Sequence, residues 1–116
     1  MEAIQELIKL LSVNRFSCSK EKETQQEIAE VFNKSSIFYQ REHWLDKKSV
    51  PDFFIDGIVI EVKIKGNARQ IFRQCERYCN IHKVKALILV TNRSMGFPKE
   101  INGIPCYFIN IGKAWL

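Results

Sequence analysis

Two strand-forming runs flank a two-residue turn in the stretch Pro51-Asp52-Phe53-Phe54-Ile55-Asp56-Gly57-Ile58-Val59-Ile60-Glu61-Val62-Lys63-Ile64. An Asp-Gly pair between two such runs is a strong short-range signal for a β-hairpin with a two-residue loop. If Asp56-Gly57 is the whole loop, Ile55 lies opposite Ile58 and Asp52 lies opposite Glu61. The stretch therefore predicts a hairpin that places two carboxylates directly across from each other.

The second strand of this hairpin separates its charged and apolar side chains. Because side chains alternate between the faces of a strand, Glu61 and Lys63 share one face. The other face is expected to pack on the core through Ile60, Val62 and Ile64. Directly opposed residues have Cβ atoms roughly 4.5–5.5 Å apart, where like charges are unfavourable. Two interpretations stay open: a solvated face with a Glu61–Lys63 pair, or a site where a divalent cation such as Mg²⁺ binds the carboxylates.

The segments around the hairpin predict an α/β fold. Helices are expected over 2–12, roughly 20–34 and about 68–82, and further strands over 37–44, 84–91 and 104–109. The first three strands can pair as an antiparallel meander, and the third helix makes a right-handed crossover to a parallel strand. The prediction is one domain over residues 1–116, with a central mixed sheet flanked by helices.

The second predicted helix, for which Ser19 is a plausible N-cap, carries a carboxylate on its apolar side. Glu21 falls on the stripe that faces the core, whereas Glu23 and Glu27 fall on the opposite side. A buried acid without a partner is costly, and a metal patch on the hairpin would supply one. The alternative is that Glu21 interacts favourably with the dipole at the helix N-terminus.

The third predicted helix follows the charged strand directly, with Gly66-Asn67 as its cap. Gln74 and Tyr78 lie one turn apart at the edge of its apolar stripe, which is also where an ordinary amphipathic boundary falls. An arginine row at helical spacing lines its outer side, formed by Arg69, Arg73 and Arg77. Such a row can follow a phosphate backbone, and solvation beside Glu76 is the usual alternative.

Composition narrows the class of protein without choosing a function. Eighteen Lys and Arg against 13 Asp and Glu in 116 residues leave a net charge of +5, which admits an anionic partner such as nucleic acid. No apolar run approaches the ~20 residues of a membrane span, so no membrane association is expected. The first apolar stretch is interrupted by Glu2, Glu6 and Lys9, unlike a signal peptide. The four cysteines are expected to be reduced thiols.

These patterns together resemble a known enzyme family. Pro51-Asp52, eight intervening residues and Glu61-Val62-Lys63 resemble the P-D…E-x-K motif of the PD-(D/E)XK nuclease superfamily. The predicted αβββαβ order from the second helix onward is similar to the restriction-endonuclease-like core of that family, here with an extra N-terminal helix. Gln74-Cys-Glu-Arg-Tyr78 looks like the Q-x-x-x-Y motif of its RecB-like branch, although Gln70 could also fill the first position.

The resemblance implies a role for each matched residue. Asp52, Glu61 and the Val62 carbonyl would bind Mg²⁺ or Mn²⁺, and Glu21 would complete the site as the first-helix acid, unless Glu23 or Glu27 fills that position. Lys63 would orient or help deprotonate the attacking water and stabilise charge on the scissile phosphate. Gln74 would position Lys63 or the metal-bound water. Tyr78 would support Gln74 or touch the DNA.

The function implied is a metal-dependent DNA nuclease that hydrolyses phosphodiester bonds, with endonucleolytic cleavage and choice of DNA structure. The small chain resembles stand-alone phage-type nucleases, the VRR-NUC group and Holliday-junction resolvases, which implies a cytoplasmic protein, phage-encoded in the first case. A junction resolvase needs two active sites, so a homodimer is compatible with this interpretation. The alternative is a non-catalytic nucleic-acid-binding or dimerisation module on the same fold.

Overall fold

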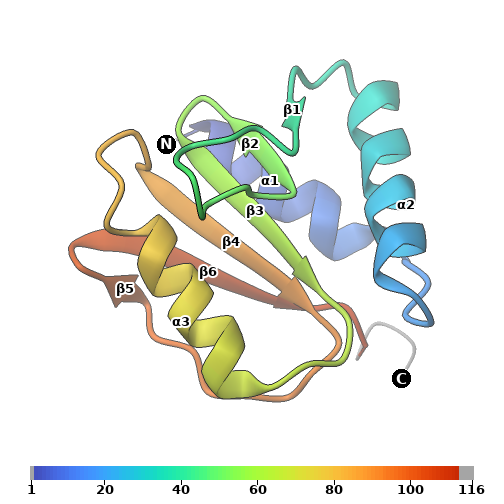
Figure 1. The fold of residues 1–116 in the computed structure, drawn as a ribbon. Coiled ribbons are helices and arrows are strands. Elements are labelled where there is room, and N and C mark those ends of the chain that lie inside the picture. Colours follow the sequence, from blue (N-terminus) through green and yellow to red (C-terminus); the bar gives the residue numbers. More distant parts are fainter. Residues whose placement is uncertain (1, 113–116) are drawn as a thin grey trace.

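The computed structural model describes residues 2–112 as an α/β fold with a mixed sheet (Figure 1). Its elements in chain order are α1 (Glu2–Val13), α2 (Glu21–Lys34), β1 (Gln40–Arg41), β2 (Phe53–Ile55), β3 (Ile58–Lys63), α3 (Ala68–Tyr78), β4 (Ala86–Thr91), β5 (Glu100–Ile101) and β6 (Ile104–Asn110). Across this part of the chain the six strands are arranged in the order β1-β2-β3-β4-β6-β5. The predicted class, a mixed sheet flanked by helices, is confirmed.

The β2–β3 hairpin has the predicted register. Ile55 pairs with Ile58 and Phe53 with Ile60 in an antiparallel ladder. Asp56 and Gly57 both have positive φ angles, 45° and 86°, as a two-residue type I′ loop requires. A Cβ atom at Gly57 would lie 3.2 Å from the Lys83 carbonyl oxygen and 3.1 Å from the Lys85 side chain, so glycine is favoured by both conformation and space.

The crossover from β3 through α3 to β4 is also as predicted. β3 and β4 pair in parallel over six residues each, from Ile58 opposite Ala86 to Lys63 opposite Thr91. β6 then pairs in parallel with β4, while β1, β2 and β3 form the antiparallel side of the sheet. The carboxyl ends of β3 and β4 therefore lie at one edge of the sheet.

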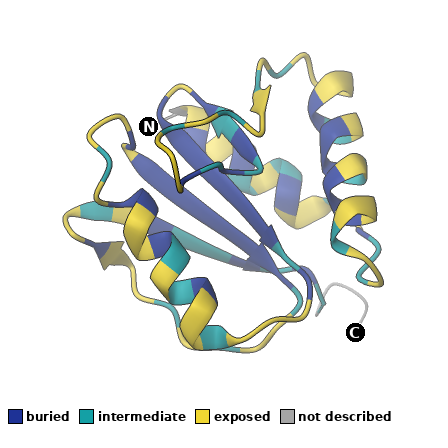
Figure 2. Cartoon of the chain, viewed as in Figure 1, coloured by how far each residue is buried: buried dark blue, intermediate teal, exposed yellow. Residues whose placement is uncertain are grey.

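Helices cover both faces of the sheet (Figure 1). On one face, α1 and α2 pack against a large apolar cluster that contains Ile60, Val62 and Ile64, as expected. On the other face, α3 packs against a second cluster that includes Val59 and Leu87. Figure 2 shows that β3 and β4 are buried along most of their length, as is usual for strands covered on both sides.

The apolar stripe of α1 belongs to the core of its own chain. Ile4, Leu7 and Leu11 are each only 1 % exposed and lie in the cluster on the α1–α2 face. These side chains are therefore not available as a dimer surface. Among residues 2–112, no helix combines the length and the apolarity needed to cross a membrane.

The strand predicted over 37–44 is much shorter in the structure. Only Gln40 and Arg41 pair with β2, because Glu42 adopts a positive φ of 50° that turns the chain away from the ladder. His43 then stacks on Phe54 instead of continuing the strand, with ring centroids 5.6 Å apart. The prediction counted strand-forming residues, but the backbone conformation at Glu42 decided the length.

Both later helices also differ from the prediction at one end. α2 has Lys20, not Ser19, as its N-cap residue, and the Ser19 hydroxyl donates instead to Glu23. α3 ends at Tyr78 rather than near residue 82. There, Asn102 in the β5–β6 turn donates to the Cys79 carbonyl oxygen at 3.2 Å, which satisfies an acceptor at the end of the helix. β5 itself was not predicted.

Candidate active site

The hairpin register brings Asp52 and Glu61 together beneath α3. The Asp52 amide donates to Glu61 Oε1 at 3.2 Å, and the Val62 amide donates to Asp52 Oδ2 at 2.7 Å. Each carboxylate is thus held by a backbone N–H group of the opposite strand. This reciprocal arrangement fixes the separation and orientation of the two acids more firmly than side-chain rotamers alone.

Lys63 lies on the same face of β3 and balances part of this negative charge. Its Nζ atom is 3.3 Å from Glu61 Oε2, and the Glu61 side chain is 2 % exposed. Burial raises the pKa of both Asp52 and Glu61. The charge of Asp52 raises the pKa of Glu61 further. For Lys63, burial alone lowers the pKa, but the nearby Glu61, Glu21 and Asp52 outweigh it and the net shift is upward.

Two side chains of α3 continue this network. Gln74 Nε2 donates to Tyr78 Oη at 3.1 Å, and Tyr78 Oη donates to Glu61 Oε1 at 3.0 Å. Tyr78 is fully buried, so in this arrangement it supports Glu61 rather than contacting a ligand. Asn67 places the helix, since its side chain accepts hydrogen bonds from the first-turn amides of Arg69 and Gln70, as predicted for the N-cap.

Among the three candidate acids of α2, Glu21 is the one that reaches this site. Its Oε1 atom accepts a hydrogen bond from the Ile64 amide at 3.1 Å, at the end of β3. Glu23 accepts instead from Ser19, and Glu27 accepts from the Ser17 amide at 2.6 Å. The predicted position of Glu21 on the core-facing side of its helix therefore brings it into contact with the end of the charged strand.

A cavity of about 350 Å³ opens beside these groups. Its wall is formed by Glu21, Lys63, Lys65, Gly66, Asn67, Gln70, Ile71, Gln74 and Arg77. Glu61 is not part of this wall, because its carboxylate is enclosed by its contacts with Lys63 and Tyr78. Among the described residues, the wall of this cavity has three cationic side chains, Lys63, Lys65 and Arg77, and one acid, Glu21.

The three arginines of the predicted row are all exposed along α3. Arg77 is the member that lines the cavity, together with Gln70 and Gln74 from the same helix. Arg69 and Arg73 are not part of the wall and face solvent. The structure thus places one of the three arginines beside the candidate site.

The sequence pattern did not single out the loop residues that join the ends of β3 and β4 next to the cavity. The Lys65 amide donates to Asn92 Oδ1 at 3.3 Å, and Arg93 Nη1 donates to the Gly66 carbonyl oxygen at 2.9 Å. These bonds join the loop after β3 to the loop after β4. These contacts could have been expected from the predicted parallel crossover, because it brings the carboxyl ends of β3 and β4 to one edge of the sheet.

Arg41 is a second cation that the sequence pattern did not mark. Its guanidinium lies 5.0 Å from the centre of the Phe53 ring and donates to Gln25 Oε1 at 3.4 Å. Its charge also lowers the pKa of Asp52, against the larger effect of burial. Its position on β1, beside the start of β2, brings it to the site.

The donor atoms at this site are suited to a hard cation. Within residues 2–112, no three His, Cys, Asp or Glu side chains converge as ligands on one point. Mg²⁺, however, is usually bound through one or two carboxylates, with water and substrate oxygens as the other ligands. Asp52 and Glu61 supply two carboxylates, and their raised pKa values reflect a buried negative charge that a cation would stabilise. The residues present therefore fit such an ion.

Comparison of the chain with protein-family models, with curated proteins and with solved structures gives no match in any of the three. The site itself combines two opposed carboxylates, a paired ammonium and a hydrogen-bonded Gln–Tyr pair beside a cation-rich cavity.

Proposed function

We propose that this protein is a metal-dependent DNA nuclease that hydrolyses phosphodiester bonds at the Asp52–Glu61–Lys63 site. The observation that carries the proposal is the reciprocal bonding of Asp52 and Glu61 across the hairpin, with the Lys63 ammonium 3.3 Å from Glu61. A module that only binds nucleic acid gains nothing from two buried acids beside a phosphate. The α2–β1–β2–β3–α3–β4 order supports the restriction-endonuclease-like core of the PD-(D/E)XK superfamily.

The proposed cofactor is Mg²⁺ or Mn²⁺. Asp52, Glu61 and the Val62 carbonyl oxygen would hold the ion, and Glu21 would complete the site directly or through water. When bound, the ion would lower the pKa of a coordinated water and polarise the scissile phosphate. Glu21 is already held next to β3 by the Ile64 amide, which limits how far its carboxylate must move to take part.

Lys63 would act on the phosphate by charge. Its raised pKa means that the ammonium stays protonated beside the three acids, so it can stabilise negative charge that develops on the phosphate oxygens. Lys63 lines the cavity, where it can reach both an attacking water and the phosphate. In this protonated form it orients the water through a donated hydrogen bond rather than removing its proton.

Tyr78 and Gln74 would act through Glu61. The Tyr78 hydroxyl restrains Glu61 Oε1, and Gln74 restrains the hydroxyl in turn. Hydrogen-bonded partners of this kind orient a ligating carboxylate and commonly change metal affinity or activity by about 10–100-fold. Lys65 and Arg77 on the cavity wall, with Arg69 and Arg73 on the exposed side of α3, would bind the DNA backbone.

Cleavage assays test the proposal directly. Purified protein is incubated with single-stranded, duplex and four-way-junction DNA, closed-circular as well as linear, in Mg²⁺ or in EDTA. The expected result is cleavage in Mg²⁺ that EDTA abolishes, with closed circles opened by endonucleolytic attack. Lack of cleavage of every substrate by the wild type would overturn the enzymatic proposal.

Matched variants test the residues. Asp52→Asn and Lys63→Ala are expected to slow cleavage by at least about 10²-fold. Glu42→Gln and Lys34→Ala remove the same charges from exposed positions and are expected to retain it. Undiminished cleavage by both site variants would overturn the assignment of the site. DNA binding that weakens with salt but ignores EDTA, with no cleavage, would favour the non-catalytic module.

A further inference from the structure

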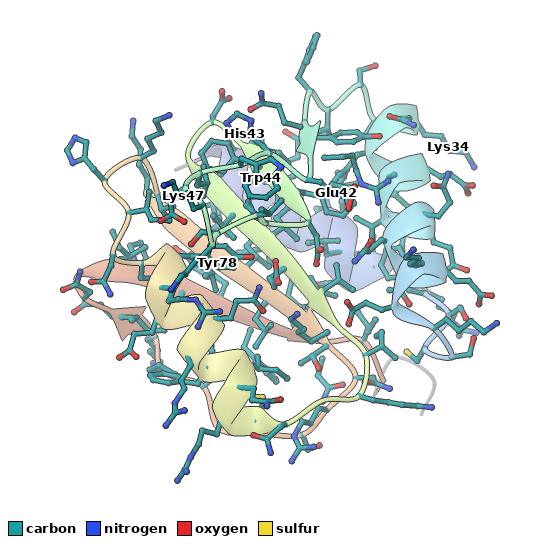
Figure 3. All side chains as sticks on the ribbon, in the orientation of Figure 1. Lys34, Glu42, His43, Trp44, Lys47 and Tyr78 are labelled. Carbon is teal, nitrogen blue, oxygen red and sulfur yellow. The ribbon has the colours of Figure 1, made fainter. Side chains whose placement is uncertain are left out.

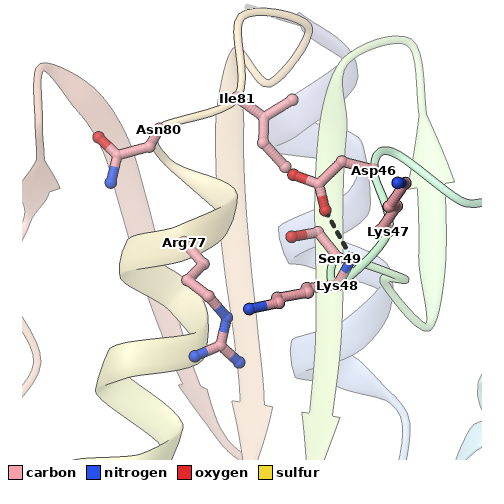
Figure 4. A pocket seen from close by; sticks show the side chains of 7 residues that line it. All are labelled: Asp46, Lys47, Lys48, Ser49, Arg77, Asn80 and Ile81. Atoms are coloured by element: carbon pink, nitrogen blue, oxygen red, sulfur yellow. Dashed lines mark hydrogen bonds between the residues drawn. The ribbon is translucent and has the colours of Figure 1, made fainter.

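A second cavity lies on the same face of the molecule, between the loop of residues 42–50 and the C-terminal half of α3 (Figure 4). Its volume is about 480 Å³, and it is lined by Asp46, Lys47, Lys48, Ser49, Arg77, Asn80 and Ile81. Arg77 also lines the candidate active-site cavity. The two cavities are therefore neighbours that share one cationic wall.

Three cations, Lys47, Lys48 and Arg77, and one acid, Asp46, are among the described residues that line this second cavity. In Figure 4 the side chains of Lys48 and Arg77 extend toward one another. Within residues 2–112 neither side chain forms an ion pair or a hydrogen bond, and the Asp46 carboxylate accepts from the Lys48 amide at 2.9 Å. The hydrogen bond from the Lys48 amide and, to a smaller extent, the charge of Arg77 lower the pKa of the Asp46 carboxylate, and one acid does not balance the three cations in the wall. The net positive charge that remains favours an anion near Lys48 and Arg77.

The loop that carries Lys47 and Lys48 is well anchored. The Leu45 amide donates to the Ser49 carbonyl oxygen at 2.9 Å, and Ser49 is 2 % exposed. Leu45 packs against the apolar cluster beneath α3. This anchoring places the residue before Leu45, Trp44, on the outer side of the loop.

Trp44 is 67 % exposed, although burying an aromatic side chain is favourable. Figure 3 shows it on the loop with His43 and Lys47. Its neighbour His43 is used within the molecule, stacked on Phe54, whereas no ring contact is formed by the indole within residues 2–112. An exposed indole beside several cations is the combination that binds unpaired nucleotides, by stacking on bases and contacting phosphates.

We propose that this loop binds an unpaired segment of a DNA strand that leaves the active-site cavity, with a base stacked on Trp44 and a phosphate between Lys48 and Arg77. The inference rests on the proposed nuclease function and names its substrate class: single-stranded DNA, or branched DNA with an unpaired arm. In a continuous duplex the faces of the bases are already stacked on each other. An indole can therefore engage a base only where pairing is interrupted.

Binding in EDTA tests the inference without any cleavage. Fluorescence anisotropy measures the affinity of a labelled oligothymidylate and of a blunt duplex of equal charge. We expect wild type to prefer the single strand, and Trp44→Ala to weaken its binding by about 5–150-fold, the range for loss of one stacked base. Trp44→Phe is expected to restore most of the affinity, and Lys48→Ala to weaken binding to both DNAs.

Phe38→Ala is the matched control, because Phe38 is an aromatic side chain that is 96 % exposed, precedes β1 in the chain and lines neither of the two cavities. Equal affinity of Trp44→Ala and wild type for the single strand would overturn the inference, as would an equal loss in Phe38→Ala. The inference would also be overturned if a poly-glutamate peptide competed as strongly as the unlabelled oligonucleotide, and did so equally well with wild type and with Trp44→Ala.

The two proposals fail in different ways. If the Trp44 effect is present in EDTA but no DNA is cut in Mg²⁺, the nuclease proposal is contradicted and the single-strand site stands. If DNA is cut in Mg²⁺ but the Trp44 effect is absent, the loop assignment is contradicted and the nuclease proposal stands.

Discussion

The two faces of the sheet are built from the same strands but differ in what they bury. On the α1–α2 face, β3 contributes Ile60 and Val62 to a continuous apolar cluster. On the α3 face, β3 contributes Val59 to a second apolar cluster and then Glu61 and Lys63, which are held in a network of charges and hydrogen bonds. Along β3, one face is therefore apolar throughout, while the other adds to its apolar cluster charged groups that cost stability and carry the proposed chemistry.

The largest expected effect on stability comes from the apolar face. Ile60 is fully buried, so Ile60→Ala is expected to lower the free energy of unfolding by about 2–5 kcal/mol through lost burial and a residual cavity. Urea unfolding followed by circular dichroism measures this. Val13→Ala is the control, because Val13 is 68 % exposed, and it is expected to change stability by less than about 0.5 kcal/mol. Equal losses of stability in Ile60→Ala and Val13→Ala would contradict the burial of Ile60 and the exposure of Val13.

An intermediate effect is expected from the hydrogen bond between α3 and Glu61. Tyr78→Phe keeps the ring but removes the hydroxyl that donates to Glu61 Oε1 at 3.0 Å. We expect cleavage to fall by about 10–100-fold and to need more Mg²⁺, because the carboxylate is less well oriented. A Mg²⁺ titration of cleavage separates this from a merely structural role. Loss of activity with an unchanged Mg²⁺ requirement would contradict a positioning role for Tyr78.

A smaller effect, an increase in stability, is expected when Glu61 is replaced. In the metal-free protein, burial raises the pKa of Glu61 from 4.5 to about 8. A raised pKa means that the stability contributed by this group is full below about pH 4.5 and is lost as pH rises toward about 8. Glu61→Gln avoids that loss, so we expect it to be more stable than wild type in EDTA at pH 8.5, by about 1–2 kcal/mol.

Varying the pH and adding Mg²⁺ provide the controls for the stability of Glu61→Gln. The stability difference between Glu61→Gln and wild type is expected to shrink as pH falls to 5, where both side chains are largely neutral. Adding Mg²⁺ at pH 8.5 is expected to stabilise wild type more than Glu61→Gln. A difference that does not vary with pH, or a variant less stable at pH 8.5, would contradict the view that this face trades stability for a buried charge.

How much of this could be read from the sequence depends on the range of the interactions involved. The hairpin register and the Asn67 cap depend on residues close together in the chain, and both are confirmed. The burial of Ile60 and Val62 follows from simple alternation. The juxtaposition of Asp52 and Glu61 follows from the register alone, which is why a single stretch was enough to locate the candidate site.

The parts that were wrong or missed depend on contacts between distant segments. The strand over 37–44 ends early because the backbone turns at Glu42 and His43 stacks on Phe54. α3 ends where Asn102 reaches its last turn from the β5–β6 hairpin. The hydrogen bonds of Lys65 with Asn92 and of Arg93 with Gly66 each join residues 27 positions apart in sequence. No local pattern encodes these contacts, because each needs the sheet to be assembled first.

The central claim is that the polar face of the sheet is a metal-dependent catalytic site, and cleavage of closed-circular DNA with and without Asp52→Asn tests it most directly. With Mg²⁺, wild type is expected to nick the circles and Asp52→Asn to be slower by at least about 10²-fold, the scale on which removal of one catalytic electrostatic group acts. The isosteric change leaves the shape of the hairpin in place. Absence of nicking by wild type, or equal rates for the two proteins, would contradict the account.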